Sequence, residues 1–76
     1  MKSATVFLPT IGEVKEFVGI ISRYSFDIDL ASGRHTVDAK SIMGIFSLDL
    51  SKPLRVEFHT DDPADFFEVI ARFITE

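Results

Sequence analysis

Three short stretches of the chain alternate between apolar and polar residues, and this pattern limits the fold more than any other feature. They cover residues 26–30, 35–39 and 54–58. Because successive side chains of a β-strand point to opposite faces, such alternation predicts strands with one buried and one solvated face. Ser32 and Gly33 separate the first two stretches and predict a turn, so these strands should form a hairpin. A further strand is predicted over residues 4–8, before Pro9.

The segment after Pro9 predicts a helix over about residues 11–23. Its apolar residues recur at helical spacing, at Val14, Phe17, Val18 and Ile21. Thr10 and Glu13 fit a capping box, in which the Thr oxygen accepts from the backbone N–H of Glu13 and the Glu reaches back. The helix is therefore expected to begin directly after Thr10.

Two further helices are predicted, one on each side of the last strand. The stretch 41–48 opens on Ser41, a good N-cap residue, and is long enough for two helical turns. In the third helix Asp62 can cap, Pro63 suits the first position and Asp65 complements the dipole. The apolar stripe of this helix is Phe66, Val69, Ile70 and Phe73.

The elements follow the order β-α-β-β-α-β-α in a single domain, residues 1–76. Strands with one polar face each predict a four-stranded antiparallel sheet covered by three helices on one face, an α+β open-faced sandwich. A chain of this size buries only roughly 60% of its unfolded surface. The composition, with 46% hydrophobic residues and eight Phe, supplies an efficient core.

Charge and composition argue against several functional classes. The net charge of −4, with eight basic residues scattered along the chain, disfavours a nucleic-acid partner. The absence of Cys excludes disulfides and thiolate metal sites, and His35 and His59 are too isolated to make a good metal site. Met1 is followed by Lys2 and Ser3 rather than by an apolar signal segment, and no apolar run approaches the ~20 residues that span a bilayer. We therefore expect a cytoplasmic protein that uses no metal, cofactor or membrane.

The middle of the chain resembles a known family. The stretch "KSIMGIFSL", residues 40–48, is similar to the regulatory-site motif of HPr, the histidine-containing phosphocarrier protein of the bacterial sugar phosphotransferase system. "EFVGIISRYSFDIDL", residues 16–30, resembles the end of the family's first helix and its second strand. The resemblance covers about residues 10–75, is strong over 17–50, and implies the fold predicted above.

The motif that defines the family is missing from this sequence. In HPr, the chain before the first helix carries Gly, an apolar residue, the phosphorylated His, a small residue, Arg and Pro. Counted back from Phe17 and Val18 without gaps, the His position falls on Thr10, the Arg position on Gly12 and the Pro position on Glu13. The comparison implies that the nucleophile and the cation are lost, and that a carboxylate which would repel a phosphoryl group has come in. Phosphocarrier activity is not expected, and no nucleophile–base pair or Gly-rich phosphate loop points to another enzyme activity.

The regulatory site of the family is retained. In HPr proteins of low-GC Gram-positive bacteria, the serine that opens the middle helix is the target of HPr kinase/phosphorylase, and it matches Ser41. Ile42 and Met43 match exposed apolar residues that contact partner proteins, and Phe46 completes the predicted docking patch. The family includes a regulatory protein, Crh, that lacks the His and acts as a corepressor with a transcription factor when its Ser is phosphorylated. The resemblance thus implies a regulatory interaction domain, whose partner is HPr kinase/phosphorylase or a transcription regulator.

Phosphorylation of Ser41 would add about −1.5 to −2 charge at the start of a helix. The helix dipole favours such a charge by roughly 0.3–1 kcal/mol at an exposed terminus, so the expected effect is a changed docking surface rather than unfolding. The alternative is that Ser41 is only a cap and that Ile42, Met43 and Phe46 belong to the core. With either role for Ser41, the presence of Gly44 requires an explanation, because a glycine inside a helix lowers stability by about 1 kcal/mol relative to alanine.

Two other functions stay open. The chain would be a phosphocarrier if His35 or His59 accepted the phosphoryl group, although neither is predicted at a helix N-terminus with a basic neighbour. It would be a structural or scaffolding domain if only the fold were kept. In that case Phe7, Phe67 and Ile74 offer apolar surface for self-association, unless the third helix has a wide buried face that takes them up.

Overall fold

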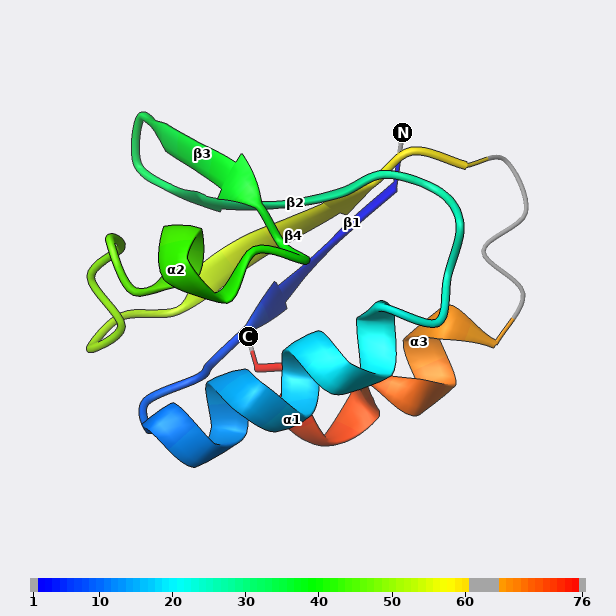
Figure 1. The fold of residues 1–76 in the computed structure, drawn as a ribbon, viewed down its shortest axis with the longest axis horizontal. Helices are drawn as coiled ribbons and strands as arrows, with labels where there is room; N and C mark the ends of the chain where they lie inside the picture. Colours follow the sequence, from blue (N-terminus) through cyan, green and yellow to red (C-terminus); the bar gives the residue numbers. More distant parts are fainter. Residues whose placement is uncertain (1, 61–64, 76) are drawn as a thin grey trace.

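A computed structural model describes residues 2–60 and 65–75 of the chain (Figure 1). The elements are β1 (Lys2–Val6), α1 (Ile11–Ile21), β2 (Ile28–Ser32), β3 (His35–Asp38), α2 (Ile42–Ile45), β4 (Leu54–Phe58), α3 (Phe66–Val69) and the 3-10 helix η1 (Ala71–Phe73). The predicted order of strands and helices is therefore confirmed. Within the described residues, no helix has the length and apolar character needed to cross a bilayer.

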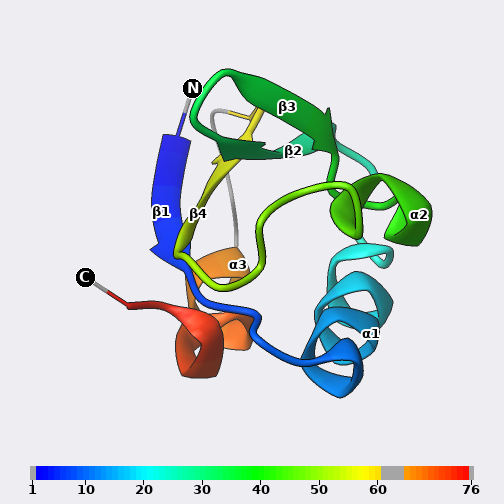
Figure 2. The same cartoon turned by 90° about the vertical axis from the view of Figure 1, so that its left-hand side faces the viewer.

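The four strands form one antiparallel sheet in the order β1-β4-β2-β3. Leu30 in β2 faces Val37 in β3 and Val56 in β4, so one face of the sheet is apolar. Its neighbour Asp29 faces Asp38 and Glu57 on the other face. The three helices lie on the apolar side, as predicted, and the acidic face stays open (Figures 1 and 2).

The core lies between the apolar face of the sheet and the helices. The stripe of α1 supplies Val14, Phe17 and Ile21, all fully buried. Phe66 in α3 is also fully buried and meets three aromatic rings, with centroid distances of 4.5 Å to Phe58, 5.3 Å to Tyr24 and 5.7 Å to Phe26. These ring contacts join the sheet to the helices that cover it.

The first strand lies earlier than predicted. β1 runs over Lys2–Val6 rather than residues 4–8, although Leu8 is buried as the alternation requires. The partner strand explains the boundary. Val6 pairs with Leu54, the first residue of β4, and Pro53 before it has no backbone N–H to extend the ladder.

The middle helix is shorter than predicted. α2 covers Ile42–Ile45 and does not continue as a regular helix to Leu48. The chain goes on in turns, with the N–H of Ser47 donating to the carbonyl of Gly44 at 3.1 Å and that of Leu48 to Ile45 at 3.0 Å. The Ser47 hydroxyl also donates to the Gly44 carbonyl, at 2.6 Å. Such a side-chain bond competes with helical bonding and favours an early end.

The third helix is broken, where one continuous helix was expected. Asp62 and Pro63, the predicted first residues, lie outside the described residues, and α3 begins at Phe66. The carboxylate of Asp65 makes no capping bond and accepts instead from the Tyr24 hydroxyl. After Val69 the chain tightens into η1, which buries Phe73 edge-on against Phe17 with ring centroids 5.5 Å apart.

The apolar residues considered for self-association do not share one environment. Phe7 and Phe67 are 37% and 39% exposed. Phe67 also packs on Phe58, with ring centroids 5.0 Å apart. Ile74 is half-buried and forms a β-bridge with Val6. α3 therefore does not bury Phe67 fully, and association through these residues stays a prediction.

Tyr24 is the single tyrosine of the chain, and its titration tests the junction between the end of α1 and the start of α3. Its hydroxyl donates to Asp65 Oδ1 at 2.6 Å. This hydrogen bond, together with desolvation and the charge of Asp65, raises the pKa of Tyr24 from 10.0 to about 12. Because the pKa is raised in the folded state, the contribution to stability is complete below pH about 10 and is lost as the pH rises from about 10 to about 12.

The ultraviolet absorbance of the phenolate should therefore rise with a midpoint near pH 12 in the folded protein. Asp65→Ala should move the midpoint back toward that of the urea-unfolded chain, about 10. A wild-type midpoint near 10, or one unchanged by Asp65→Ala, would show that this hydrogen bond does not hold the junction.

Candidate functional site

Thr10, which the sequence comparison predicts at the family's His position, caps α1. Its Oγ1 accepts from the backbone N–H of Glu13 at 3.1 Å, as the capping box predicts. The Glu13 carboxylate lies against the Thr10 hydroxyl, which donates to Oε1 at 3.3 Å, rather than bonding the backbone of Thr10. Gly12, predicted at the family's Arg position, is exposed and supplies no side chain. This helix start therefore presents the hydroxyl of Thr10 and the carboxylate of Glu13.

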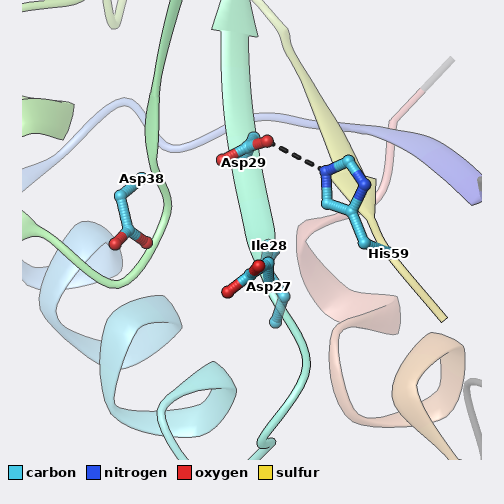
Figure 3. Close-up of a pocket in the computed structure, with 5 residues that line it drawn as sticks. All are labelled: Asp27, Ile28, Asp29, Asp38 and His59. Atoms are coloured by element: carbon cyan, nitrogen blue, oxygen red, sulfur yellow. Dashed lines mark hydrogen bonds and ion pairs between the residues drawn. The ribbon is translucent and has the colours of Figure 1, made fainter.

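Both histidines lie on the sheet, away from the helix N-termini. His35 is exposed at the start of β3, opposite Ser32 at the hairpin turn. His59 directly follows β4, and its Nε2 lies 2.9 Å from Asp29 Oδ2 (Figure 3). These positions agree with the interpretation of both as strand or surface histidines.

A hollow of about 380 Å³ lies on the open face of the sheet (Figure 3). It is lined by Asp27, Ile28, Asp29, Asp38 and His59. Among the described residues, no group of three or more acidic or histidine side chains has the arrangement to hold a metal ion. The hollow is best explained as part of the solvated face that the alternating pattern predicts.

Ser41 is exposed at the N-cap of α2. Its Oγ accepts from the backbone N–H of Gly44 at 3.3 Å, and its own N–H donates to the carbonyl of Asp38 at 3.0 Å. The Asp38 carboxylate accepts from the N–H of Lys40 at 2.9 Å. These bonds form a tight turn between β3 and α2 that fixes the backbone of Ser41 and leaves its hydroxyl open to solvent.

The side chain of Lys40 is turned away from Ser41. Its Nζ donates to the carbonyls of Tyr24 at 2.6 Å and Phe26 at 2.9 Å, which ties the loop after α1 to the start of α2. Lys40 therefore helps to place Ser41, and its ammonium group is already hydrogen-bonded elsewhere.

Gly44 has a structural reason to lack a side chain. A Cβ at this position would lie 3.3 Å from the Cβ of Val37 and 3.4 Å from the Oγ of Ser41. Both distances are tight, so glycine lets α2 approach β3 and leaves room for the cap. The reason for a glycine at this position is therefore a close approach within the chain itself.

The predicted docking patch of Ile42, Met43 and Phe46 is exposed in part. Met43 is 77% and Phe46 39% exposed, so neither belongs to the core. Ile42 is half-buried and packs against the core, which corrects the expectation that it is exposed like Met43. The fully buried residue of α2 is Ile45. We call Ile42, Met43 and Phe46 the α2 patch.

Ile11 is an exposed apolar residue that the sequence did not identify. It is 62% exposed in the first turn of α1, although its spacing from Val14 places it in line with the buried stripe. α2 and the first turn of α1 lie at the same end of the molecule, which Figure 2 views directly. The sequence could have indicated this exposed residue only through its position next to the cap Thr10, since Ile11 was not among the residues predicted for the buried stripe.

The carboxylate of Asp49, four residues after Ile45, faces its own turn. It accepts from the backbone N–H of Ser51 at 3.1 Å and from its hydroxyl at 2.6 Å. These hydrogen bonds lower the pKa of Asp49. Asp49 is therefore ionised at neutral pH and belongs to the loop after α2.

Comparison with known proteins agrees with the resemblance seen in the sequence. Residues 13–76 match the model of the PTS-HPr family, described as "PTS HPr component phosphorylation site". The matched range begins after Thr10 and Gly12. No curated protein matches the chain significantly.

Two crystal structures share the fold. HPr-C-His from Thermoanaerobacter tengcongensis is 26% identical, with a TM-score of 0.79, over 95% of this chain and 89% of that one. The phosphocarrier protein HPr from Bacillus anthracis is 27% identical, with a TM-score of 0.72, over 97% of this chain and 94% of that one. The similarity thus extends over nearly the whole length of both proteins.

Proposed function

This chain belongs to the HPr family of the phosphotransferase system, and from that premise we propose that it is a regulatory protein-interaction domain without phosphocarrier activity. Ser41 is its phosphorylation site, and the α2 patch is its docking surface. The protein has no enzymatic activity of its own and works in the cytoplasm. Its partner is HPr kinase/phosphorylase or a transcription regulator.

One observation carries this proposal: the two sites of the family differ in what they retain. At the start of α1, Thr10 and Gly12 replace the residues that accept and steady a phosphoryl group. At the start of α2, the exposed hydroxyl of Ser41 stands beside the exposed side chains of Met43 and Phe46. An accessible hydroxyl next to exposed apolar side chains suits a surface that a partner binds and a kinase modifies.

The placement of Lys40 supports a role for a partner protein. A phosphate on Ser41 would carry about −1.5 to −2 charge, and the ammonium group of Lys40 is bound to the carbonyls of Tyr24 and Phe26. The chain's own adjacent cation is thus not positioned to neutralise the phosphate. The charge remains available to Arg or Lys side chains of a partner, which bind phosphate strongly.

The short length of α2 changes the expected energetics of phosphorylation. A helix of four residues has a small dipole, so it stabilises the phosphate less than the predicted two-turn helix would. Phosphorylation still leaves the core intact, because Ser41 is exposed and its backbone is fixed by Asp38. The modification would act on the docking surface and not on the fold.

Incubation with HPr kinase/phosphorylase and ATP tests the Ser41 assignment. Intact mass should show one added phosphate on the wild type and none on Ser41→Ala, because the variant lacks the accepting hydroxyl. Ser47→Ala is the matched control, since Ser47 lies at the other end of α2, is also exposed, and should not affect the reaction.

Wild-type protein that gains no phosphate, or Ser41→Ala protein that gains as much as the wild type, would defeat the assignment. Absence of phosphate together with absence of binding to the kinase would favour the structural-domain alternative.

A further inference from the structure

Residues 73–75 cover part of the edge of β1 that faces away from β4. The N–H of Thr75 donates to the carbonyl of Thr5 at 2.8 Å, and Ile74 bridges Val6. The carbonyl of Phe73 accepts from the N–H of Phe7 at 2.9 Å. β1 is an edge strand, with β4 on its other side. We call residues 74–75 the strap.

The strap is held less firmly than the residue before it. Phe73 is 4% exposed and packs against Phe17, so it is anchored in the core. Among the described residues beyond Phe73, one backbone bond joins the strap to β1, from Thr75 to Thr5, while Ile74 is half-buried against the core and its N–H donates to the carbonyl of Ala71 at 3.1 Å. A segment that so few backbone bonds join to its neighbouring strand opens locally at low free-energy cost, while the rest of the domain stays folded.

Release of the strap would expose a strand edge ready for pairing. The carbonyl of Thr5 points away from β4, so its N–H and the corresponding groups of Ser3 point the same way. Residues 3–8 carry no charged side chain, whereas natural edge strands are commonly protected by charges. A hollow of about 440 Å³, lined by Ser3, Thr5, Phe67 and Ile74 among others, leaves space beside this edge.

The edge is complementary to itself. In an antiparallel pair of two β1 strands with the two-fold axis at Ala4, Ser3 of one copy faces Thr5 of the other. Both residues have outward N–H and carbonyl groups, so the pair exchanges four backbone hydrogen bonds. No like charges meet across residues 3–5, and the contact closes as a symmetric dimer.

We propose that the strap guards the β1 edge, and that its release allows two copies of the chain to pair through β1. The proposal is independent of Ser41 and of the α2 patch. It places any self-association on backbone pairing at the sheet edge rather than on the exposed Phe7 and Phe67.

Thr75→Pro tests the guard, because proline removes the N–H that binds Thr5. Loss of one backbone hydrogen bond favours the open form by about fivefold in each copy. Since both copies must open, the dimer dissociation constant from sedimentation equilibrium should fall by about 25-fold, the square of that factor. Thr75→Ala keeps the N–H and should behave like the wild type.

A second substitution locates the interface. Ser3→Pro removes an outward N–H, which an edge strand tolerates, and in the Thr75→Pro background it should raise the dissociation constant at least back to the wild-type value. Circular dichroism verifies that each variant is folded. Thr75→Pro protein that associates no more than Thr75→Ala, or as strongly with Ser3→Pro as without it, would overturn the proposal.

Hydrogen exchange on the unmodified chain gives a test that needs no variant. The Thr75 amide should exchange much faster than the Phe7 amide, because the strap opens while Phe73 stays anchored. Equal protection of the two amides would show that the strap does not open separately, and would also overturn the proposal.

Discussion

Incubation with phosphoenolpyruvate and enzyme I is expected to leave this protein without an acid-labile phosphate. Thr10 is engaged as a helix cap, its hydroxyl contacts the Glu13 carboxylate, and Gly12 supplies no cation. Removal of a catalytic nucleophile lowers rates by many orders of magnitude, on the order of 10⁶ in well-studied enzymes. Intact mass at neutral pH should show no phosphorylated species under conditions in which a phosphocarrier HPr is fully converted.

Phosphorylation of either histidine would contradict this prediction. His35 is exposed on β3, and His59 follows β4 with its ring against the Asp29 carboxylate, so neither has a phosphate-binding environment. An acid-labile phosphate that disappears in His35→Ala or His59→Ala would show that the chain carries phosphate after all. The regulatory proposal would then have to be given up in favour of phosphocarrier activity.

Phe66→Ala should destabilise the protein more than any other single substitution considered. The side chain is fully buried and meets Tyr24, Phe26 and Phe58, and truncation of a buried Phe costs about 3–5 kcal/mol. At roughly 0.05–0.15 kcal/mol per residue, the free energy of unfolding of a domain of this length is about 4–11 kcal/mol. At about 4–8 °C per kcal/mol for a domain of this size, the midpoint of thermal unfolding should fall by about 12–40 °C.

Phe67→Ala is the matched control for Phe66→Ala. The two residues are neighbours in α3, but Phe67 is 39% exposed and has an aromatic contact with Phe58. Its truncation should cost below about 1.5 kcal/mol, since less apolar surface leaves water. Equal losses in urea unfolding would contradict the division between the buried and exposed faces of α3.

The sheet could be predicted from the sequence because alternation is a local signal. The buried residues Ile28, Leu30, Val56 and Phe58 each follow their strand's pattern. The ends of elements were less well predicted, since they depend on partners distant in the sequence. β1 stops opposite Leu54, because Pro53 before it has no N–H to extend the ladder. α3 gives way to η1, which places Phe73 against Phe17.

The location of the candidate site at α2 was predicted from the sequence motif, and the exposure of its side chains was then corrected by the packing seen in the structure. The role of Ser41 as an N-cap was expected from capping preferences, and its bond to the Gly44 N–H confirms that role. The half-burial of Ile42 and the exposure of Ile11 were not predicted, because both depend on how α2 and α1 pack against the sheet. The contacts of Lys40 with Tyr24 and Phe26 also join segments that sequence reasoning had no means to bring together.

The central claim is that partners bind at α2, and chemical-shift mapping by nuclear magnetic resonance tests it most directly. In a titration of the isotopically labelled protein with HPr kinase/phosphorylase, the largest amide shifts should fall on residues 41–46, with Ile11 also affected. The open face of the sheet, represented by Asp29 and Glu57, should stay unchanged. Shifts confined to that face, or none at concentrations that bind HPr, would contradict the account.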